Sequence, residues 1–367
     1  MHYSARIKTM WKFKSMRKLV YTFFFSLLLC VQGCYHDNSL IFNRKISLKG
    51  KEIKSNQLLD PIDLLVYDTL LFVKEPLRGD KCLKILSLID YNLISEAVFI
   101  GRGAGELTNP GPIAICKKND VLWISDWGKS VCFKFPIDSI IANLQYRPNE
   151  TFKIKTKLLP MMNVFTHASG NLGFSCYSLQ ENLVSFIDLQ GELVDNMAIP
   201  NTVFPYIWDN CNLSDNPILL HYNHSKKRTV VAARYENKIA VIDDQGNISF
   251  KLETPLKKMK MNTRKTAWQG KYSTFYSIDS DKNFIYCLYR GGYAAGWDKS
   301  SKFPVNIYPS RLLVFDWNGV RKCELELDHE IIFSVLDENR NCFIGSSETA
   351  INGLVMYDLS FLNNSIQ

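Results

Sequence analysis

The residues of this sequence that could perform chemistry include two closely spaced histidines. His221 and His224 stand three residues apart in "HYNH" (221–224), and two imidazoles on one side of a chain can ligate a metal ion. The segment has the pattern of a strand, however, and residues an odd number apart point to opposite sides of a strand. We therefore expect ordinary surface histidines, with a metal site as the alternative.

A second set of residues could hold a divalent cation such as calcium if the fold brought them together. Calcium takes carboxylate and amide oxygens, and the candidates fall near the expected starts of inner strands: His167, His329, Asp60, Asn109 and Asp209. Their spacing along the chain does not show that they converge. We expect no cofactor, and the alternative function is a hydrolase or lyase with a divalent cation in a central channel.

The sequence lacks the usual catalytic and phosphate-binding signatures. It has no G-x-S-x-G nucleophile elbow and no Cys-x-x-Cys pair with metal-ligand spacing. The run Gly101-x-Gly103-x-Gly105 precedes a strand pattern instead of a helix, so it does not fit a dinucleotide-binding loop. These observations favour a binding protein over an enzyme.

A repeated turn motif indicates where the strands that would position these residues begin and end. Two apolar residues, Asp, any residue, Asn or Gln, and Gly recur in "FIDLQG" (186–191), "VIDDQG" (241–246) and "VFDWNG" (314–319). Weaker relatives occur at 88–93, 136–141 and 356–361. Asp and Gly are turn residues, because Asp accepts hydrogen bonds from nearby backbone N–H groups and Gly adopts positive φ. We interpret the aspartates as turn caps that build the fold: Asp90, Asp138, Asp188, Asp243, Asp316 and Asp358.

The repeat predicts the fold class. The spacing is roughly fifty residues, and each copy also carries an upstream polar turn followed by an apolar strand, as in "NDVLWIS" (119–125). Several short strands joined by tight turns indicate a four-stranded antiparallel meander, and six of them predict an all-β, six-bladed β-propeller over 39–362. The orphan strand "SLIFNRKISLKG" (39–50) is expected to pair with the last blade and close the ring. A solenoid or an open sandwich is the alternative.

Three insertions interrupt the regular spacing, at 201–217, 254–273 and 291–310. Counting strands outward places the first two between blades and the third between the second and third strands of the fifth blade. All three would then project from one face, opposite the Asp turns. They are rich in aromatic residues, and long loops on a rigid scaffold commonly carry function. The predicted ligand face comprises Tyr206, Trp208, Trp268, Tyr293 and Trp297; the alternative is that these rings fold back over the core.

The N-terminus is typical of a targeting segment. Arg17-Lys18 precedes an uncharged apolar stretch that ends in Val31-Gln32-Gly33-Cys34, an order that resembles a bacterial lipobox. We predict a signal peptide over 1–33, with a true start at Met16 as an option, acylation of Cys34 and a tether over 34–38. Acyl chains would make the membrane a partner of this protein. An ordinary cleaved signal is the alternative.

The net charge bears on the kind of partner, and the spacing of the cysteines bears on their role in the fold. The formal charge is +8, but six basic residues and no acidic one precede Cys34, so the remaining chain is nearly neutral. A nearly neutral body gives no sign of a phosphate-binding surface, and we expect no nucleic-acid partner. The cysteines after Cys34 are far apart and lie mostly in apolar runs, where cysteine is usually a small buried hydrophobe.

Two segments carry a family resemblance. "GRGAGELTNPGPIAICKKNDVLWISDWGKSVCFKF" (101–135) is similar to an NHL-type repeat, with a Gly-rich start, Glu106 and an aromatic strand that ends in Asp126. With the lipobox and "RLLVFDWNGVRKCELELDHEIIFSVLDENRNCFIG" (311–345), the chain resembles the TolB-like six-bladed propeller lipoproteins of Bacteroidales. The resemblance implies the cell envelope of a Gram-negative bacterium, with an outer-membrane lipoprotein expected, and carries over no catalytic residue.

The function expected from these observations is an envelope-anchored binding or interaction module. Its partner would be a protein, a peptide or a glycan, bound through the face that carries the insertions. A rigid spacer in a larger envelope assembly is a further alternative.

Overall fold

The computed structural model describes most of the chain after residue 41. It covers 42–57, 59–77, 79–155, 158, 160–176, 182–194, 197, 199–200, 218–254, 272–293, 295–297 and 304–365. All of these residues belong to the compact unit Leu40–Gln367. The predicted signal peptide, Cys34 and the tether lie outside the described residues.

The first three blades are antiparallel sheets whose strands run outward in chain order. Blade 1 consists of β3 (Asp63–Tyr67), β4 (Leu70–Lys74), β5 (Lys81–Ser87) and β6 (Leu93–Phe99). Blade 2 consists of β7 (Pro110–Cys116), β8 (Val121–Asp126), β9 (Val131–Pro136) and β10 (Thr151–Lys153). Blade 3 consists of β11 (Met161–Thr166), β12 (Leu172–Cys176), β13 (Asn182–Ile187) and β14 (Ile199–Pro200).

The next three blades repeat this order, with two additions from the N-terminal segment. Blade 4 consists of β15 (Ile218–Asn223), β16 (Arg228–Ala233), β17 (Asn237–Asp243) and β18 (Ile248–Thr254). Blade 5 consists of β19 (Tyr272–Ser280), β20 (Phe284–Tyr293), β23 (Arg311–Asp316) and β24 (Arg321–Leu327), with β1 (Lys45–Leu48) outside them. Blade 6 consists of β25 (Ser334–Asp337), β26 (Cys342–Ser346), β27 (Leu354–Asp358) and β2 (Lys51–Glu52).

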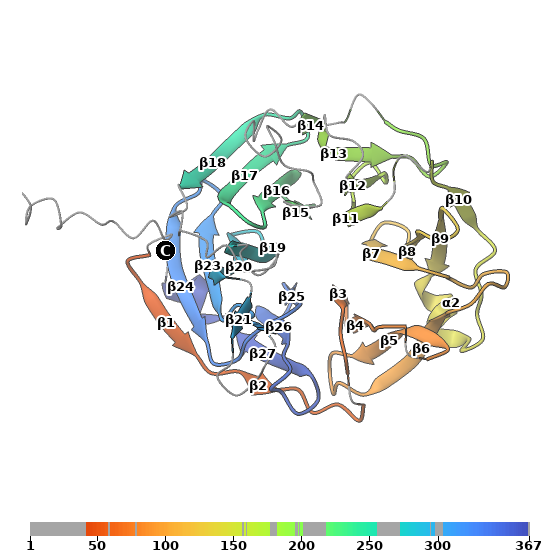
Figure 1. Cartoon of the computed structure of the whole chain (residues 1–367), viewed down its shortest axis with the longest axis horizontal. Coiled ribbons are helices and arrows are strands. Elements are labelled where there is room, and N and C mark those ends of the chain that lie inside the picture. The colour runs from red at the N-terminus through yellow and green to blue at the C-terminus, as the bar shows by residue number, and fades with distance from the viewer. Residues whose placement is uncertain are drawn as a thin grey trace, which may run out of the picture. The chain divides into compact units, whose positions relative to one another are not determined.

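Six blades stand around a centre that is lined by the inner strands β3, β7, β11, β15, β19 and β25 (Figure 1). The predicted six-bladed β-propeller of four-stranded antiparallel blades is therefore confirmed. Each blade buries both of its faces against neighbouring blades, which is why its middle strands are apolar without alternation.

The N-terminal segment is divided between two blades instead of pairing with the last blade alone. β1 pairs in parallel with β24 of blade 5, and β2 pairs antiparallel with β27 of blade 6. Gly50 lies between these two strands, where a Cβ atom would come within 2.3 Å of Val355 and 2.9 Å of Tyr357. The missing side chain lets the backbone cross from one blade to the next.

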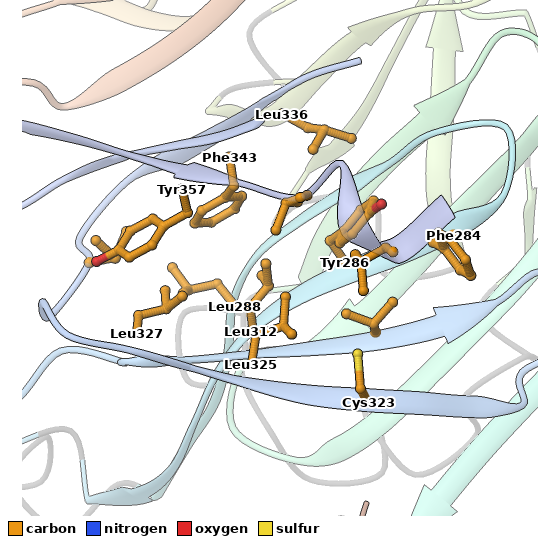
Figure 2. Close-up of a cluster of buried hydrophobic side chains, with 14 of the residues drawn as sticks. Phe284, Tyr286, Leu288, Leu312, Cys323, Leu325, Leu327, Leu336, Phe343 and Tyr357 are labelled. Carbon is orange, nitrogen blue, oxygen red and sulfur yellow. The ribbon is translucent and has the colours of Figure 1, made fainter. Parts of the chain in front are cut away.

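Hydrophobic side chains fill the space between adjacent blades. Figure 2 shows the cluster between blades 5 and 6, where Leu288, Leu312 and Leu325 lie across from Phe343 and Tyr357. The Phe343 side chain is fully buried. Because each blade contributes one layer to two such clusters, the ring is held by burial between blades as well as by hydrogen bonds within them.

The predicted role of the turn aspartates is confirmed in blades 3, 4 and 5. Each Oδ1 of Asp188, Asp243 and Asp316 accepts two backbone N–H groups, from the residues two and four positions on, at 2.8–2.9 Å. The following glycine has φ of 80–84°. These turns join the two outer strands of their blades, as expected.

Blade 2 departs from this pattern. Asp138 lies in the first turn of the short helix α2 (Ile137–Ala142), so it does not cap a tight turn there. Ile137 and Ile140 of this helix are buried against the cluster between blades 1 and 2. Two apolar residues three apart on one helical face explain why a helix forms. A second short helix, α4 (Phe361–Ser365), follows blade 6.

Candidate functional site

The strand order defines two faces of the propeller. Successive strands of a blade alternate in direction, so blade-to-blade links and the loops between second and third strands open on one face. All three insertions leave on this side: 201–217 between β14 and β15, 255–271 between β18 and β19, and 294–310 between β20 and β23. We call it the insertion face. The opposite side, which carries the Asp188, Asp243 and Asp316 turns, is the turn face.

The structure describes only some of the aromatic residues predicted to form the ligand face. Tyr206, Trp208 and Trp268 lie outside the described residues. Tyr293 is the last residue of β20 and pairs with Tyr272, and Trp297 ends the short strand β21 (Ala295–Trp297), opposite Pro304 of β22 (Pro304–Asn306). Their side chains also lie outside the description, so their role stays a prediction.

On the insertion face, Thr274 joins blades 4 and 5. Its backbone N–H donates to the carbonyl of Arg234 at 2.8 Å, and its hydroxyl lies 2.8–3.0 Å from the carbonyls of Ala233, Arg234 and Glu236. Thr274 is completely buried. The loop between β16 and β17 is thereby fixed against the start of β19.

A bulge brings a second arginine to the same threonine. Ser273 pairs with Gly292 and Phe275 pairs with Tyr289, so Thr274 faces both Arg290 and Gly291 on β20. Gly291 has φ of 62°, which suits glycine at such a bulge. Arg234 and Arg290 therefore flank Thr274 from two different blades.

The side chains of these arginines lack acidic partners within the described part of the chain. The Arg234 guanidinium lies over the Tyr276 ring, 5.1 Å from its centroid. The Arg290 Nε atom is buried without a hydrogen-bond acceptor there, and the same holds for the hydroxyl of Ser273. The position that a Cβ of Gly292 would take is 3.6–3.8 Å from the Arg290 guanidinium. Arg290 thus extends along β20 toward the insertion face.

Nearby charges are already matched. Arg311 Nε lies 3.2 Å from Glu324 Oε1, and Lys238 Nζ lies 2.6 Å from Glu236 Oε2. Glu330 accepts the backbone N–H of Tyr308. Arg234 and Arg290 are the two cations left over among these neighbours, and no motif in the sequence joined them. The sequence feature that could have identified Arg234 and Arg290 is an arginine near the end of the second strand in two consecutive blades.

The turn face carries a ring of titratable residues around the channel mouth. In every blade, the first residue after the inner strand is ionisable: Asp68, Lys117, His167, His224, Asp281 and Glu338. A repeated position of this kind could have been found from the sequence. The Asp281 carboxylate is engaged by its own turn. It accepts hydrogen bonds from the N–H groups of Asn283 and Phe284 and from the hydroxyl of Tyr286.

The predicted position of His167 was wrong, because this residue follows the end of the inner strand β11 instead of preceding its start. Its Nδ1 accepts the N–H of Ser169 at 3.1 Å, so the neutral ring carries its proton on Nε2, which lies 3.1 Å from Asp244 Oδ1. Burial and the Asp244 carboxylate raise the pKa of the neighbouring Tyr222 to about 12. Both His167 nitrogens are engaged, so this group ties blade 3 to blade 4.

His221 and His224 lie at the same mouth, and the prediction that they are ordinary surface residues holds for His224 only. The side chain of His224 is the more exposed of the two, although neighbouring groups remove part of its ring from water, and His221 is partly buried on β15. Removal from bulk water, together with His224 and Lys117, lowers the pKa of His221 to about 4. The pKa of His224 is also lowered by burial and by Lys117. The His221 imidazole is therefore neutral at physiological pH.

Asp279 is a buried acid on an inner strand whose pKa is strongly raised. It lies on β19 and accepts the backbone N–H of Leu336 from blade 6. Burial, with a smaller contribution from Glu338, raises its pKa to about 7. This carboxyl group changes charge near neutral pH.

The other predicted cation ligands do not meet. Asp60 is exposed at the link before β3, and the backbone N–H of Asn109 donates to Asp126 before β7. His329 contacts Asp328 and Tyr357 at the junction of blades 5 and 6. Asp209 lies outside the described residues. Among the residues that are described, no three His, Cys, Asp or Glu side chains are grouped so as to hold a metal ion.

The glycine-rich segment has a structural role. Glu106 Oε2 accepts the N–H of Gly103, and Asp126 accepts the N–H groups of Thr108, Asn109, Gly128 and Lys129. These hydrogen bonds lower the pKa of Asp126 against the opposing effect of its burial. The carboxylates hold the link between blades 1 and 2.

The described cysteines are all free and buried: Cys82, Cys116, Cys132, Cys176, Cys287, Cys323 and Cys342. Burial raises the pKa of the Cys82 and Cys342 thiols to about 12. Within the described part of the chain, no helix has the length and apolar character needed to cross a bilayer.

The strand order defines a six-bladed β-propeller. The chain belongs to the TolB-like 6-blade propeller-like family, whose model matches residues 41–339. A search of curated proteins finds no match.

Solved structures with the same fold are distant in sequence. A member of the DUF4221 family from Bacteroides vulgatus is similar with a TM-score of 0.57 and 11% identity, over 84% of this chain and 94% of that one. A "Putative exported protein" from Bacteroides fragilis has a TM-score of 0.52 and 8% identity, over 85% and 98%. The calcium-binding protein regucalcin from Agrobacterium tumefaciens has a TM-score of 0.50 and 10% identity, over 86% and 95%. At these identities the likeness concerns the fold alone.

Proposed function

We propose that this protein is an envelope lipoprotein, anchored through acylated Cys34, whose propeller binds a protein, peptide or glycan through its insertion face. The observation that supports the proposal is that the described strands on either side of the three insertions end on the same face. Long loops on a rigid scaffold are where binding residues concentrate.

The contrast between the two faces supports this assignment. The outer turns of blades 3, 4 and 5 on the turn face are short and use their aspartate side chains for their own backbone. The three insertions are much longer than is needed to connect the strands on either side of them. They include Trp208, Trp268 and Trp297. Exposed tryptophan and tyrosine anchor protein partners and stack on flat ligands.

The envelope assignment draws on the sequence and on a fold relative. The apolar segment before Cys34 has the length of a signal sequence. The similar protein from Bacteroides fragilis is described by its name as exported. Both fit a protein that acts outside the cytoplasm.

The test is a comparative capture from native envelopes, in which bound proteins and bound glycans are both analysed. The bait is the purified chain, beside a Trp208→Ala, Trp268→Ala, Trp297→Ala variant that is shown to be folded by circular dichroism. A matched control removes three exposed apolar side chains from the turn face: Ile89→Ala, Leu189→Ala, Val320→Ala. A partner that is retained by the control and lost by the tryptophan variant supports the proposal. Equal capture by all three baits contradicts it.

A further inference from the structure

The turn face carries two kinds of ionisable side chain on opposite halves of its inner rim. The rim is formed by the first residue after the inner strand of each blade, and all of these residues lie in the described part of the chain. Nitrogen side chains come from blades 2, 3 and 4, and carboxyl side chains come from blades 5, 6 and 1, which are neighbours around the ring (Figure 1). The rim residues are Asp68, Lys117, His167, His224, Asp281 and Glu338.

Hydrogen bonds between neighbouring blades hold this rim in place. The Tyr67 hydroxyl at the end of β3 donates to Asp120, which lies in the same turn of blade 2 as Lys117. Asn223 Nδ2 at the end of β15 donates to Ser280 Oγ of blade 5 at 2.9 Å. The histidine at the blade 3 position is tied to blade 4 in the same way. A rim that is fixed before a ligand arrives loses little conformational entropy on binding.

Two members of the rim are engaged by the protein itself, and two that carry opposite charges are not. His167 lies 3.1 Å from Asp244, and Asp281 accepts hydrogen bonds from its own turn. Lys117 of blade 2 and Glu338 of blade 6 are both exposed. Neither side chain makes a hydrogen bond or an ion pair with any residue that the structure describes. The rim therefore presents one ammonium group and one carboxylate that are held apart.

The charge of Lys117 acts on both sides of the rim. Burial and Lys117 lower the pKa of His224 on blade 4. On blade 6, partial removal from water raises the pKa of Glu338, and Lys117 opposes that rise. Exposed charges more than about 10 Å apart are largely screened by salt, so the Lys117 side chain lies close to both blades. Its ammonium group thus extends from blade 2 toward the centre of the ring.

We infer that the inner rim of the turn face binds a zwitterion, either a free amino acid or a short peptide, whose carboxylate is held by Lys117 and whose ammonium group is held by Glu338. A ligand with charge of one sign would be attracted by one half of the rim and repelled by the other, whereas a zwitterion matches both. Both contacts are charge-assisted hydrogen bonds, which are the stronger kind. The site lies opposite the insertion face, so the inference does not depend on the proposed function.

The His221 imidazole supplies a further polar contact at this place. It lies on the inner strand β15, just before the rim position of blade 4, and it is neutral at physiological pH. A neutral imidazole offers one donor and one acceptor. It can therefore hydrogen-bond a polar group of the ligand between the two charged ends without adding a charge of its own.

The test measures binding to the purified full chain, first as a shift of the melting temperature and then by isothermal titration calorimetry. The probes are the common L-amino acids and a set of dipeptides, so that the two sources of a zwitterion are told apart. Each ligand that binds is compared with its N-acetyl form and its carboxamide, which lack one charge each. Succinate and putrescine serve as probes that carry charge of one sign.

The variants are Lys117→Gln and Glu338→Gln, and each is expected to bind the free ligand about tenfold or more weakly, as the loss of one charge-assisted hydrogen bond predicts. Lys117→Gln should bind the carboxamide as well as the parent protein does, because the lost partner is then missing on both sides. Glu338→Gln should behave in this way toward the N-acetyl form. The matched controls are the exposed residues Lys118→Gln, in the same turn, and Glu348→Gln, on the insertion face.

The inference is supported if at least one amino acid or dipeptide binds, if blocking either end weakens binding, and if each variant loses its sensitivity to one blocked end only. It is overturned if no amino acid or dipeptide binds, or if the blocked forms bind as tightly as the free ligand. Equal weakening by Lys118→Gln or Glu348→Gln also overturns it, as does binding of succinate or putrescine with the affinity of the zwitterion.

Discussion

The Nε2 atom of His167 lies 3.1 Å from Oδ1 of Asp244 and thereby connects the inner turn of blade 3 to the outer turn of blade 4. The imidazole is buried between Phe186 and Tyr222, with ring centroids at 5.4 and 4.7 Å. This pair stabilises the packing of blade 3 against blade 4. A histidine beside a carboxylate is also a common catalytic arrangement. Its role can be tested by stability.

Replacing His167 should loosen the junction of blades 3 and 4. His167→Ala removes the Nε2 donor from Asp244 Oδ1, and the expected loss is about 1–3 kcal/mol of unfolding free energy. His167→Gln places an amide N–H near the former Nε2 and should lose less. Urea unfolding at neutral pH measures both, and equal losses in the two variants would argue against the hydrogen bond as the cause.

Asp279 should make the protein less stable as the pH rises. Its folded pKa of about 7 lies above the ordinary value of 3.8, so the folded state holds a proton that the unfolded state has released. Stability is therefore full below pH 4 as far as this group is concerned, and is lost as the pH rises toward and through 7. Asp279→Asn keeps the acceptor for Leu336 and should flatten this dependence in urea unfolding between pH 5 and 8. The exposed Asp60→Asn serves as the control, and an unchanged slope in Asp279→Asn would refute the assignment.

Phe343 should be among the costliest truncations in the core between blades 5 and 6. Its side chain is fully buried in the cluster of Figure 2, so Phe343→Ala removes its contacts and leaves a cavity, at about 3–5 kcal/mol. Ile351→Ala, at a side chain that is 78% exposed, should change stability by less than about 0.5 kcal/mol. Thermal and urea unfolding of the two variants give the comparison.

Gly50 should control how the N-terminal segment attaches to the ring. In Gly50→Val the new side chain meets Val355 and Tyr357, so β1 and β2 cannot both keep their partners β24 and β27. Hydrogen exchange should then show lower protection in 45–52 and in the outer strands of blades 5 and 6, with blades 2 and 3 unchanged. Uniform loss of protection in all blades would instead indicate global unfolding.

Acylation of Cys34 should decide where the protein is found. Cys34→Ser removes the thiol that a lipid attachment needs, and the protein should move from the membrane fraction to the soluble fraction of envelopes. Labelling with a clickable fatty acid gives an independent readout, with label expected on the parent chain only. Label that persists in Cys34→Ser would place the attachment elsewhere.

The repeat, the class of fold and the turns could all be predicted from the sequence, because they depend on interactions within a few residues. The Asp-to-backbone hydrogen bonds of Asp188, Asp243 and Asp316 reach only four positions ahead, so their motif is legible without a structure. Strand counting also predicted that the insertions leave from one face, since direction alternates within each blade, and the described strands that flank them end on that face. The short helix at Asp138 was not predicted, because it is stabilised by the packing of its buried isoleucines against blade 1.

Tertiary structure alone decided which distant residues meet. Thr274 joins Arg234 to Arg290, and Asp279 meets the N–H of Leu336, only after neighbouring blades pack. The N-terminal strand was likewise divided between two blades where Gly50 permits close approach. Such contacts depend on how the whole ring closes, and no local pattern of polarity or turn residues encodes that closure.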